Sequence, residues 1–361
     1  MIVGRIALNG GKKKSNSPYY MFAAQTIPQN AQKVKEYLLK HNLLHTDYLL
    51  VKEFDYLYFP LRKRAKVPLA TIKNVRFHFP PKQKSLTVEE QLKDKLTIPE
   101  LQLLPKSQET VGDILILEIP AELQKKEKII AEAYLRSNKH LQTVVKKDHI
   151  HAGEYRLRKV KILAGKKSKE TIHSENGIKL KLHLEKTYFS ARSAHERLRI
   201  AQLIKPGEEV LVVFSGAAPY PLVIAKNAPV RRVYGIEINP FAHQYAVENV
   251  ALNNLREKIT LHYGDVREIM PSLTQKFDRV IMPLPKTGEE FLYLALPKTK
   301  PGGMVHLYAF LNETEIKSHA TKIRKLCTTL KHPVKIIRAV KCGQFSPGVF
   351  RVCFDLKVQK G

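Results

Sequence analysis

The chain has 361 residues, of which 43% are hydrophobic, so it is long enough for two or three domains with sizeable cores. Its formal net charge is +29, spread over both halves, which excludes a neutral enzyme with a basic tail and favours nucleic acid, ahead of an anionic membrane surface, as partner. The N-terminus shows no apolar core of a signal peptide, and no run of about 18 apolar residues occurs, so we expect a cytoplasmic protein. Three cysteines are too few for a disulfide framework or a metal cluster, so we expect no metal.

The first 63 residues predict a small α+β domain. A helical spacing of apolar residues at Val34, Tyr37 and Leu38 precedes two short strand patterns, which flank an Asp turn and cover 48–54 and 56–61. Residues 64–108 are interrupted by prolines, and we expect a linker there that carries a short helix near 88–96.

A second α+β domain is predicted over residues 109–186. A strand at 114–119 precedes a helix at 121–137. Three basic segments with period-two alternation follow, at 140–147, 154–165 and 177–189. Because Lys and Arg crowd the outer faces of these segments, we expect this domain to bind RNA phosphates and to contribute to the pocket for the target base.

From residue 187 to residue 361 helices and strands alternate. A helix at 193–204 leads into strands predicted at 208–216, 231–240, 258–266, 277–285 and 304–310, with helices between them and a hairpin at 334–358. Such alternation predicts an α/β domain of the Rossmann-like type, with a mostly parallel, doubly wound sheet that the C-terminal antiparallel hairpin completes.

Three consecutive strands of this domain end in residues of a type that binds ligands. Small residues in 214–220 let a ligand approach the backbone in front of a helix, Glu237 is placed to accept ribose hydroxyls, and Asp265 to accept an exocyclic amine. The candidates for cofactor binding are Phe214, Gly216, Ala218, Glu237, Ile238, Asn239, Asp265 and Val266. Because no Gly-x-Gly-x-x-Gly fingerprint follows the first strand, the pattern favours S-adenosylmethionine over NAD. The alternative is three ordinary polar strand ends. In either case Asn239 is expected to cap the helix that begins at Pro240.

The segment 277–286, FDRVIMPLPK, reads as a buried strand stopped by two prolines. Ligands of open α/β sheets bind just beyond the carboxyl ends of the strands, so Pro283 and Pro285 are predicted to form a rigid elbow beside a ligand. The alternative is an ordinary Pro-rich loop.

Several ordered segments are similar to one family, the archaeal and eukaryotic tRNA guanine-37 N1-methyltransferases with their wyosine-pathway relatives. The resemblance extends over about 30–360 and is carried by the segments 153–165, 170–182, 188–201, 234–240, 284–286 and 346–358. It implies a class I methyltransferase that uses S-adenosylmethionine and binds tRNA at the anticodon loop and at the outer corner. We also expect a monomer.

The resemblance also implies catalytic residues. Guanine N1 carries a proton, so a base must remove it while a cation stabilises the charge on O6. By resemblance Glu196 is the base, Arg156 or Arg158 is the O6 partner, Tyr188 and Arg192 hold the target base and Glu196, and Pro285 belongs to the same site. From the residues alone, Glu196 also reads as a helix-surface carboxylate paired with an Arg.

Three positions depart from the family pattern. Val212 stands where the family has an acid, Ala218 replaces the second Gly of a Gly-x-Gly turn, and Pro283 replaces the Asn of Asn-Leu-Pro. The adenosine half of the site, Glu237 and Asp265, is retained, whereas the methionine half and one wall of the base pocket are expected to differ. Three functions therefore stay open: a methyltransferase acting on guanosine 37 or a tricyclic wyosine precursor, an aminocarboxypropyl transferase, and a tRNA-binding homologue with weakened catalysis.

Overall fold

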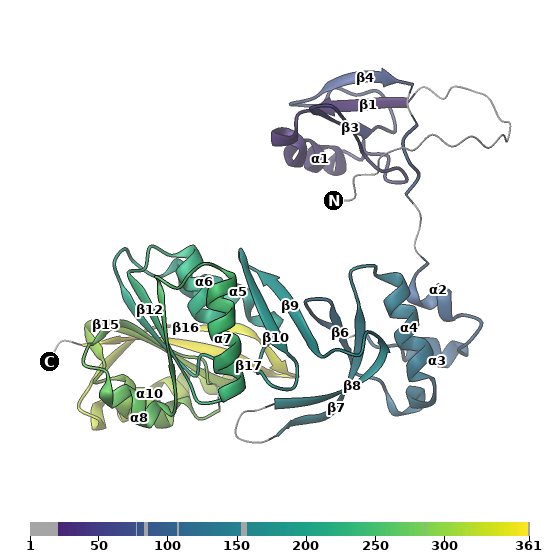
Figure 1. Cartoon of the computed structure of the whole chain (residues 1–361). Coiled ribbons are helices and arrows are strands. Elements are labelled where there is room, and N and C mark those ends of the chain that lie inside the picture. Colours follow the sequence, from purple (N-terminus) through teal and green to yellow (C-terminus); the bar gives the residue numbers. More distant parts are fainter. Residues whose placement is uncertain are drawn as a thin grey trace. The chain divides into compact units, whose positions relative to one another are not determined.

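The computed structural model describes residues 21–76, 78–82, 86–106, 108–152, 157–284 and 286–359, with 149–152 described by their backbone alone. Two residues predicted to belong to the site, Arg156 and Pro285, lie outside the described residues. The chain divides into two compact units, Met1–Leu86 and Thr87–Gly361, which we describe separately (Figure 1). In the described part of the chain, no helix combines the length and the apolar character that a membrane span requires.

The first unit is a small antiparallel sheet covered by one helix. Its described strands follow the order β2-β3-β1-β4 and are β1 (Met21–Thr26), β2 (Val51–Glu53), β3 (Tyr56–Pro60) and β4 (Thr71–Val75). Helix α1 (Ala31–Lys40) buries Val34 and Leu38 completely against this sheet, as its apolar spacing predicts. Strand β4 lies inside the segment expected to be a linker, because an edge strand with few buried residues carries little periodic signal.

The second unit begins with a four-stranded sheet and a hairpin. The sheet follows the order β5-β6-β7-β8, in which β6 and β7 run parallel, and comprises β5 (Gln108–Val111), β6 (Ile114–Leu117), β7 (Thr143–Ala152) and β8 (Leu157–Gly165). Helices α2 (Val88–Leu92), α3 (Ile98–Gln102) and α4 (Glu127–Ser137) accompany it, and β9 (Glu170–Glu175) pairs with β10 (Ile178–His183). Every residue of β6 is buried, which explains the continuous apolar run in its sequence.

A seven-stranded sheet forms the rest of the second unit, in the order β13-β12-β11-β14-β15-β17-β16. Its strands are β11 (Glu209–Val213), β12 (Arg232–Glu237), β13 (Ile259–Tyr263), β14 (Phe277–Met282), β15 (Thr299–Asn312), β16 (Val334–Ser346) and β17 (Val349–Val358). The strands from β11 to β15 pair in parallel, whereas β17 is antiparallel to both β15 and β16. This confirms the predicted Rossmann-like fold with its C-terminal hairpin.

Helices cover both faces of this sheet (Figure 1). They are α5 (Ala194–Gln202), α6 (Pro219–Asn227), α7 (Pro240–Leu252), α8 (Val266–Ser272), α9 (Leu292–Ala295) and α10 (Ile316–Thr329). Along β11, Val210 and Val212 join the core cluster that includes α6, whereas Leu211 and Val213 join the cluster that includes α10. Alternate side chains of a buried strand point to opposite faces, so Val212 is a core residue here.

Candidate active site

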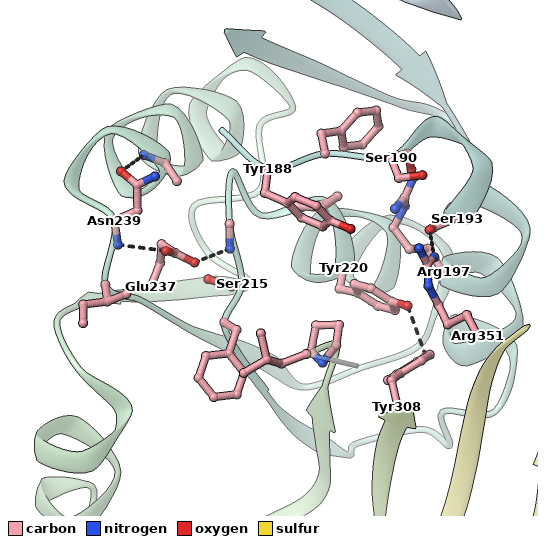
Figure 2. Close-up of a pocket in the computed structure, with 18 residues that line it drawn as sticks. Tyr188, Ser190, Ser193, Arg197, Ser215, Tyr220, Glu237, Asn239, Tyr308 and Arg351 are labelled. Atoms are coloured by element: carbon pink, nitrogen blue, oxygen red, sulfur yellow. Dashed lines mark hydrogen bonds between the residues drawn. The ribbon is translucent and has the colours of Figure 1, made fainter. Parts of the chain in front are cut away.

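A pocket opens where β11, β12 and β14 end, beyond their carboxyl ends (Figure 2). This is the position at which open α/β sheets bind ligands. Its described lining residues are Tyr188, Phe189, Ser190, Ser193, Arg197, Phe214, Ser215, Gly216, Pro219, Tyr220, Glu237, Ile238, Asn239, Ala242, Pro283, Leu284, Tyr308 and Arg351. The structure thus brings together six of the predicted site residues, namely Tyr188, Phe214, Gly216, Glu237, Ile238 and Asn239.

Glu237 is fixed at the end of β12 by backbone donors. Its carboxylate accepts the N–H of Gly216 at 2.6 Å and the N–H of Asn239 at 2.8 Å. Burial raises the pKa of this carboxyl, and the backbone N–H donors act in the opposite direction. The Asn239 side chain caps α7 by accepting from the N–H of Phe241 at 3.0 Å, so its role as a helix cap is confirmed.

The turn between β11 and α6 brings backbone close to the pocket. Phe214, Gly216 and Ala218 have φ angles of 57°, 57° and 66°, in the left-handed region that a residue with a Cβ adopts only at a cost of about 1–2 kcal/mol. The Ala218 methyl is fully buried in the core and is absent from the described pocket lining. The structure therefore places the extra methyl of Ala218 in the core, although the sequence placed it beside the methionine end of a cofactor.

Asp265 and Val266 lie at the start of α8 and are absent from the described residues that line the pocket. Asp265 caps the helix by accepting the N–H of Arg267 at 2.8 Å, and the Arg267 side chain pairs with the same carboxylate. These bonds, led by the one from the Arg267 side chain, lower the pKa of Asp265. Its predicted contact with adenine requires that the Arg267 side chain leave room for the ligand.

The strand that carries the proline elbow behaves as its sequence predicts. β14 ends at Met282, directly before Pro283, and the N–H of Leu284 donates to the carbonyl of Met282 at 2.8 Å. A three-residue turn of this kind needs a central φ that proline already has. Pro283 and Leu284 form part of the pocket wall, so the segment is more than an ordinary loop.

Polar and aromatic side chains gather at the other end of the pocket. Tyr220, 6% exposed, lies on α6, and Tyr308, 1% exposed, lies on β15; their hydroxyl oxygens are 3.1 Å apart (Figure 2). Arg197 is held by a bidentate pair with Glu175 at 2.5 and 2.6 Å. Arg351 of β17 donates to the hydroxyl of Ser193.

Glu196 lies behind this cluster, on α5, and is only 4% exposed. Arg199 donates to its two carboxylate oxygens at 2.7 and 2.8 Å, and the Tyr308 hydroxyl donates to Oε1 at 2.6 Å. Glu196 is not among the described residues that line the pocket, whereas Tyr308 is. The buried position rules out the reading of Glu196 as a surface carboxylate.

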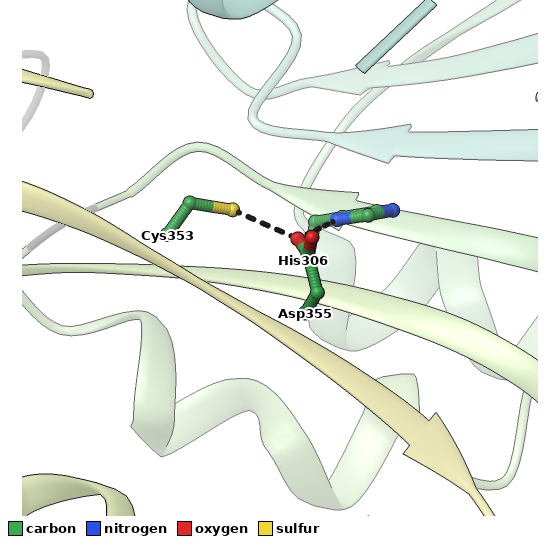
Figure 3. Close-up of side chains that lie close together, drawn as sticks. All are labelled: His306, Cys353 and Asp355. Atoms are coloured by element: carbon green, nitrogen blue, oxygen red, sulfur yellow. Dashed lines mark hydrogen bonds and ion pairs between the residues drawn. The ribbon is translucent and has the colours of Figure 1, made fainter. Parts of the chain in front are cut away.

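Arg199 links Glu196 to a second buried carboxylate, Asp355 of β17, at 3.1 Å. Asp355 also accepts from Arg338 at 2.7 Å and lies 2.6 Å from Nδ1 of His306, with Cys353 beside it (Figure 3). His306, Cys353 and Asp355 are close enough to ligate a metal, but two guanidinium groups already neutralise the carboxylate. The cluster therefore anchors Arg199 and offers poor conditions for a cation.

The remaining predicted residues lie around the pocket. Arg158, 6% exposed, donates to Glu109 at 3.0 Å and to the carbonyl of Phe189 at 2.6 Å, so its guanidinium supports the segment next to Tyr188. Arg192 is exposed in the turn before α5 and is not among the described lining residues. Arg156 and Pro285 lie outside the described residues.

Comparison with known proteins assigns the chain to a family. Residues 171–337 match the TRM5/TYW2 methyltransferase domain, residues 88–168 the TYW2 N-terminal domain, and residues 28–69 the tRNA methyltransferase 5 N-terminal domain. The tRNA (guanine(37)-N(1))-methyltransferase Trm5b of Pyrococcus abyssi is 32% identical over 94% of this chain and 99% of its own length. The chain belongs to the TRM5/TYW2 methyltransferase family.

Solved structures of the TRM5/TYW2 family share this architecture. The structure described as a complex of aTrm5 and tRNALeu matches with a TM-score of 0.66 and 26% identity, over 94% of this chain and all of that one. Pyrococcus horikoshii TYW2 in complex with MeSAdo matches with a TM-score of 0.66 and 28% identity, over 76% of this chain and 98% of that one. The resemblance stated from the sequence is thereby confirmed.

The pocket suits S-adenosylmethionine, the cofactor of the TRM5/TYW2 family. The Ser215 hydroxyl is buried on the pocket wall and has no hydrogen-bond partner among the described residues, so a polar ligand would satisfy it. The Glu237 carboxylate retains acceptor capacity beyond its backbone donors, which suits ribose hydroxyls. Sequence reasoning missed Tyr220, Tyr308 and Arg351 as pocket residues, although two of them lie in motifs that it singled out.

Proposed function

We propose that the protein transfers a methyl group from S-adenosylmethionine to N1 of the guanosine at position 37 of tRNA. The observation that carries the proposal is the match to Trm5b along almost the full length of both chains, with Glu237 on the pocket wall and Glu196 bonded to the lining residue Tyr308. The cofactor, when bound, supplies an electrophilic methyl group on its sulfonium sulfur.

The residues at the ends of β11 and β12 are proposed to bind the cofactor. Glu237 would accept hydrogen bonds from the ribose hydroxyls, and Ile238 and Phe214 would supply apolar walls. The protein backbone of the turn at Gly216 would lie close to the cofactor. Asp265 would bind the adenine amine at the edge of this region, with Val266 behind it. Ala218 acts only through the shape of the turn, since its side chain lies in the core.

The residues around Glu196 are proposed to activate the target base. The N1 proton must leave as the methyl arrives, and Glu196 is its final acceptor, because its carboxylate is buried next to the pocket. Tyr188, 38% exposed on the pocket wall, would stack on the target base, and Arg192 would help to hold that base and Glu196. Since the Arg158 guanidinium is occupied by Glu109 and Phe189, Arg156 keeps the proposed role at O6.

The charge of +29 is proposed to bind tRNA phosphates. On β8, Lys159 and Lys161 are exposed while Arg158 and Val160 are buried, so the strand presents a basic outer face as its alternation predicts. A monomer would contact the anticodon loop with this domain and the methyltransferase domain, and the outer corner with the N-terminal unit. The target base would be flipped into the pocket.

The experiment incubates the purified full chain with an unmodified tRNA transcript and methyl-labelled S-adenosylmethionine, followed by nucleoside mass spectrometry. We expect N1-methylguanosine at position 37. A parallel reaction supplies tRNA that carries a tricyclic wyosine precursor at position 37. Methylation or an aminocarboxypropyl adduct in that reaction alone, or tight tRNA binding without product in either reaction, would overturn the proposal in favour of one of the alternatives.

A further inference from the structure

The carboxylate that must take the proton is separated from the pocket by a tyrosine. Glu196 is 4% exposed and is not among the described residues that line the pocket, whereas Tyr308 is. The Tyr308 hydroxyl donates its proton to Oε1 of Glu196 at 2.6 Å. In this arrangement a base in the pocket meets Tyr308 before it meets Glu196.

The Tyr308 oxygen has a lone pair that can accept a hydrogen bond from a group in the pocket. A phenolic oxygen carries one proton and accepts hydrogen bonds through its lone pairs. Its proton points to Glu196, so it accepts from the hydroxyl of Tyr220 at 3.1 Å (Figure 2). These two bonds leave one lone pair of the same oxygen unused, and the N1–H of a guanine is a donor that could bond to it.

A role confined to orienting Glu196 would leave this bond superfluous. Arg199 already donates to both carboxylate oxygens, and Asp355 holds Arg199 in turn at 3.1 Å. Burial raises the pKa of Tyr308 far above its ordinary value, and nearby acidic groups act in the same direction. A free tyrosinate is therefore excluded near neutral pH, and Tyr308 can accept a proton only while it gives its own away.

We propose that Tyr308 is a catalytic residue that relays the proton from the target base to Glu196. As the methyl group bonds to N1, the N1–H bond breaks and its proton bonds to the Tyr308 oxygen. In the same step the original Tyr308 O–H bond breaks and that proton bonds to Oε1 of Glu196. The electron pair of the N1–H bond forms the new N–C bond, while the methyl–sulfur bond breaks and its electron pair stays on the sulfur of the cofactor. The step ends with neutral Glu196 and unchanged Tyr308. This inference rests on the proposed function.

The decisive variant is Tyr308→Phe, which removes one oxygen and retains the ring that packs in the core. Tyr134→Phe is the matched control. Tyr134 is also buried, at 7% exposure, and donates its hydroxyl to the carbonyl of Pro105 at 3.0 Å, but it belongs to a different core cluster, formed with α4. Both variants lose one buried tyrosine hydroxyl, and only one of them loses the relay.

The assay is single-turnover methyl transfer by the full chain with saturating S-adenosylmethionine, alongside tRNA affinity by filter binding. We expect Tyr308→Phe to lower the transfer rate by about 100-fold or more, the range of general acid–base catalysis, with tRNA affinity within about twofold of wild type. Tyr134→Phe should keep both quantities within about twofold. A Tyr308→Phe rate within about threefold of wild type would overturn the relay.

A second readout needs no variant and so does not depend on folding of the mutant. The wild-type transfer rate is measured in mixtures of H₂O and D₂O. A relay moves two protons in one step, so a plot of the rate against the deuterium fraction should curve downward. Direct transfer to Glu196 moves one proton and should give a straight line. A straight line would reject the relay and leave the methyltransferase intact; wild-type inactivity would reject the proposed function itself.

Discussion

Replacing Glu237 by Gln tests the nucleoside half of the pocket. The carboxylate accepts from Gly216 at 2.6 Å and Asn239 at 2.8 Å, so both of its oxygens are fixed at the end of β12. A Gln side chain of the same shape keeps one oxygen and turns an NH₂ group toward the second donor, and the negative charge is lost. Hydrogen bonds to a charged group contribute about 1.5–3 kcal/mol, and ~1.4 kcal/mol corresponds to a tenfold change in affinity. The affinity for the cofactor should therefore fall roughly 10- to 150-fold.

Isothermal titration calorimetry with S-adenosylhomocysteine, which cannot react, measures this affinity on the full chain. Glu248→Gln is the control, because Glu248 also belongs to this domain but is 40% exposed and pairs with Lys181 at 3.0 Å outside the pocket. The affinity of the Glu248→Gln variant for S-adenosylhomocysteine should stay within about twofold of wild type. If Glu237→Gln binds within about threefold of wild type and remains folded by circular dichroism, the assignment of the ribose site to Glu237 is refuted.

Three further expectations follow from the same structure. Pro283→Asn restores the family's amide on the pocket wall. If it regains one hydrogen bond of about 0.5–1.5 kcal/mol, the single-turnover rate should rise about 2- to 12-fold, whereas an unchanged rate would show that this departure is tolerated. Arg279→Leu strips partners from Glu208, the Leu203 carbonyl and His306, and should lower the free energy of unfolding in urea by about 3–5 kcal/mol, whereas a loss under about 1 kcal/mol would contradict it. Burial lowers the pKa of His306 from its ordinary 6.5, so below that pH the unfolded chain binds a proton that the folded chain does not. The free energy of unfolding should therefore fall as the pH is lowered from about 7.5 to about 5.5, and an equal fall in wild type and in His306→Gln would argue against this cause.

The fold was predictable because its signals are local. The apolar run of β11, Val210–Val213, supplies side chains to both covered faces of the sheet, and such a run is typical of a buried parallel strand. Glu237 and Asn239 were found because ligand residues follow strand ends at a fixed place in this fold. β4 was missed because an edge strand buries few side chains and so shows no period.

The polar end of the pocket was not predictable, because distant segments build it. Tyr308 reads as a core residue of an apolar strand, and the pairing of β15 with its neighbours brings it to Glu196, 112 residues earlier in the chain. Arg199 and Asp355 are 156 residues apart. Asp265 is a different case: the sequence predicts a ligand contact for its carboxylate, but could not show that Arg267, two residues later, pairs with the same group.

The insertion of β17 between β15 and β16 has a consequence for biosynthesis. β17 follows every other described element in the chain, yet it supplies Asp355, which anchors Arg199, and Arg351 on the pocket wall. While the ribosome is still making β17, the parallel strands β11 to β15 are complete but β15 presents a bare edge, a template for wrong pairing. A nascent chain stopped before Val349 would therefore carry the Glu237 end of the pocket but would lack Arg351 and the Asp355 partner of Arg199 at the other end.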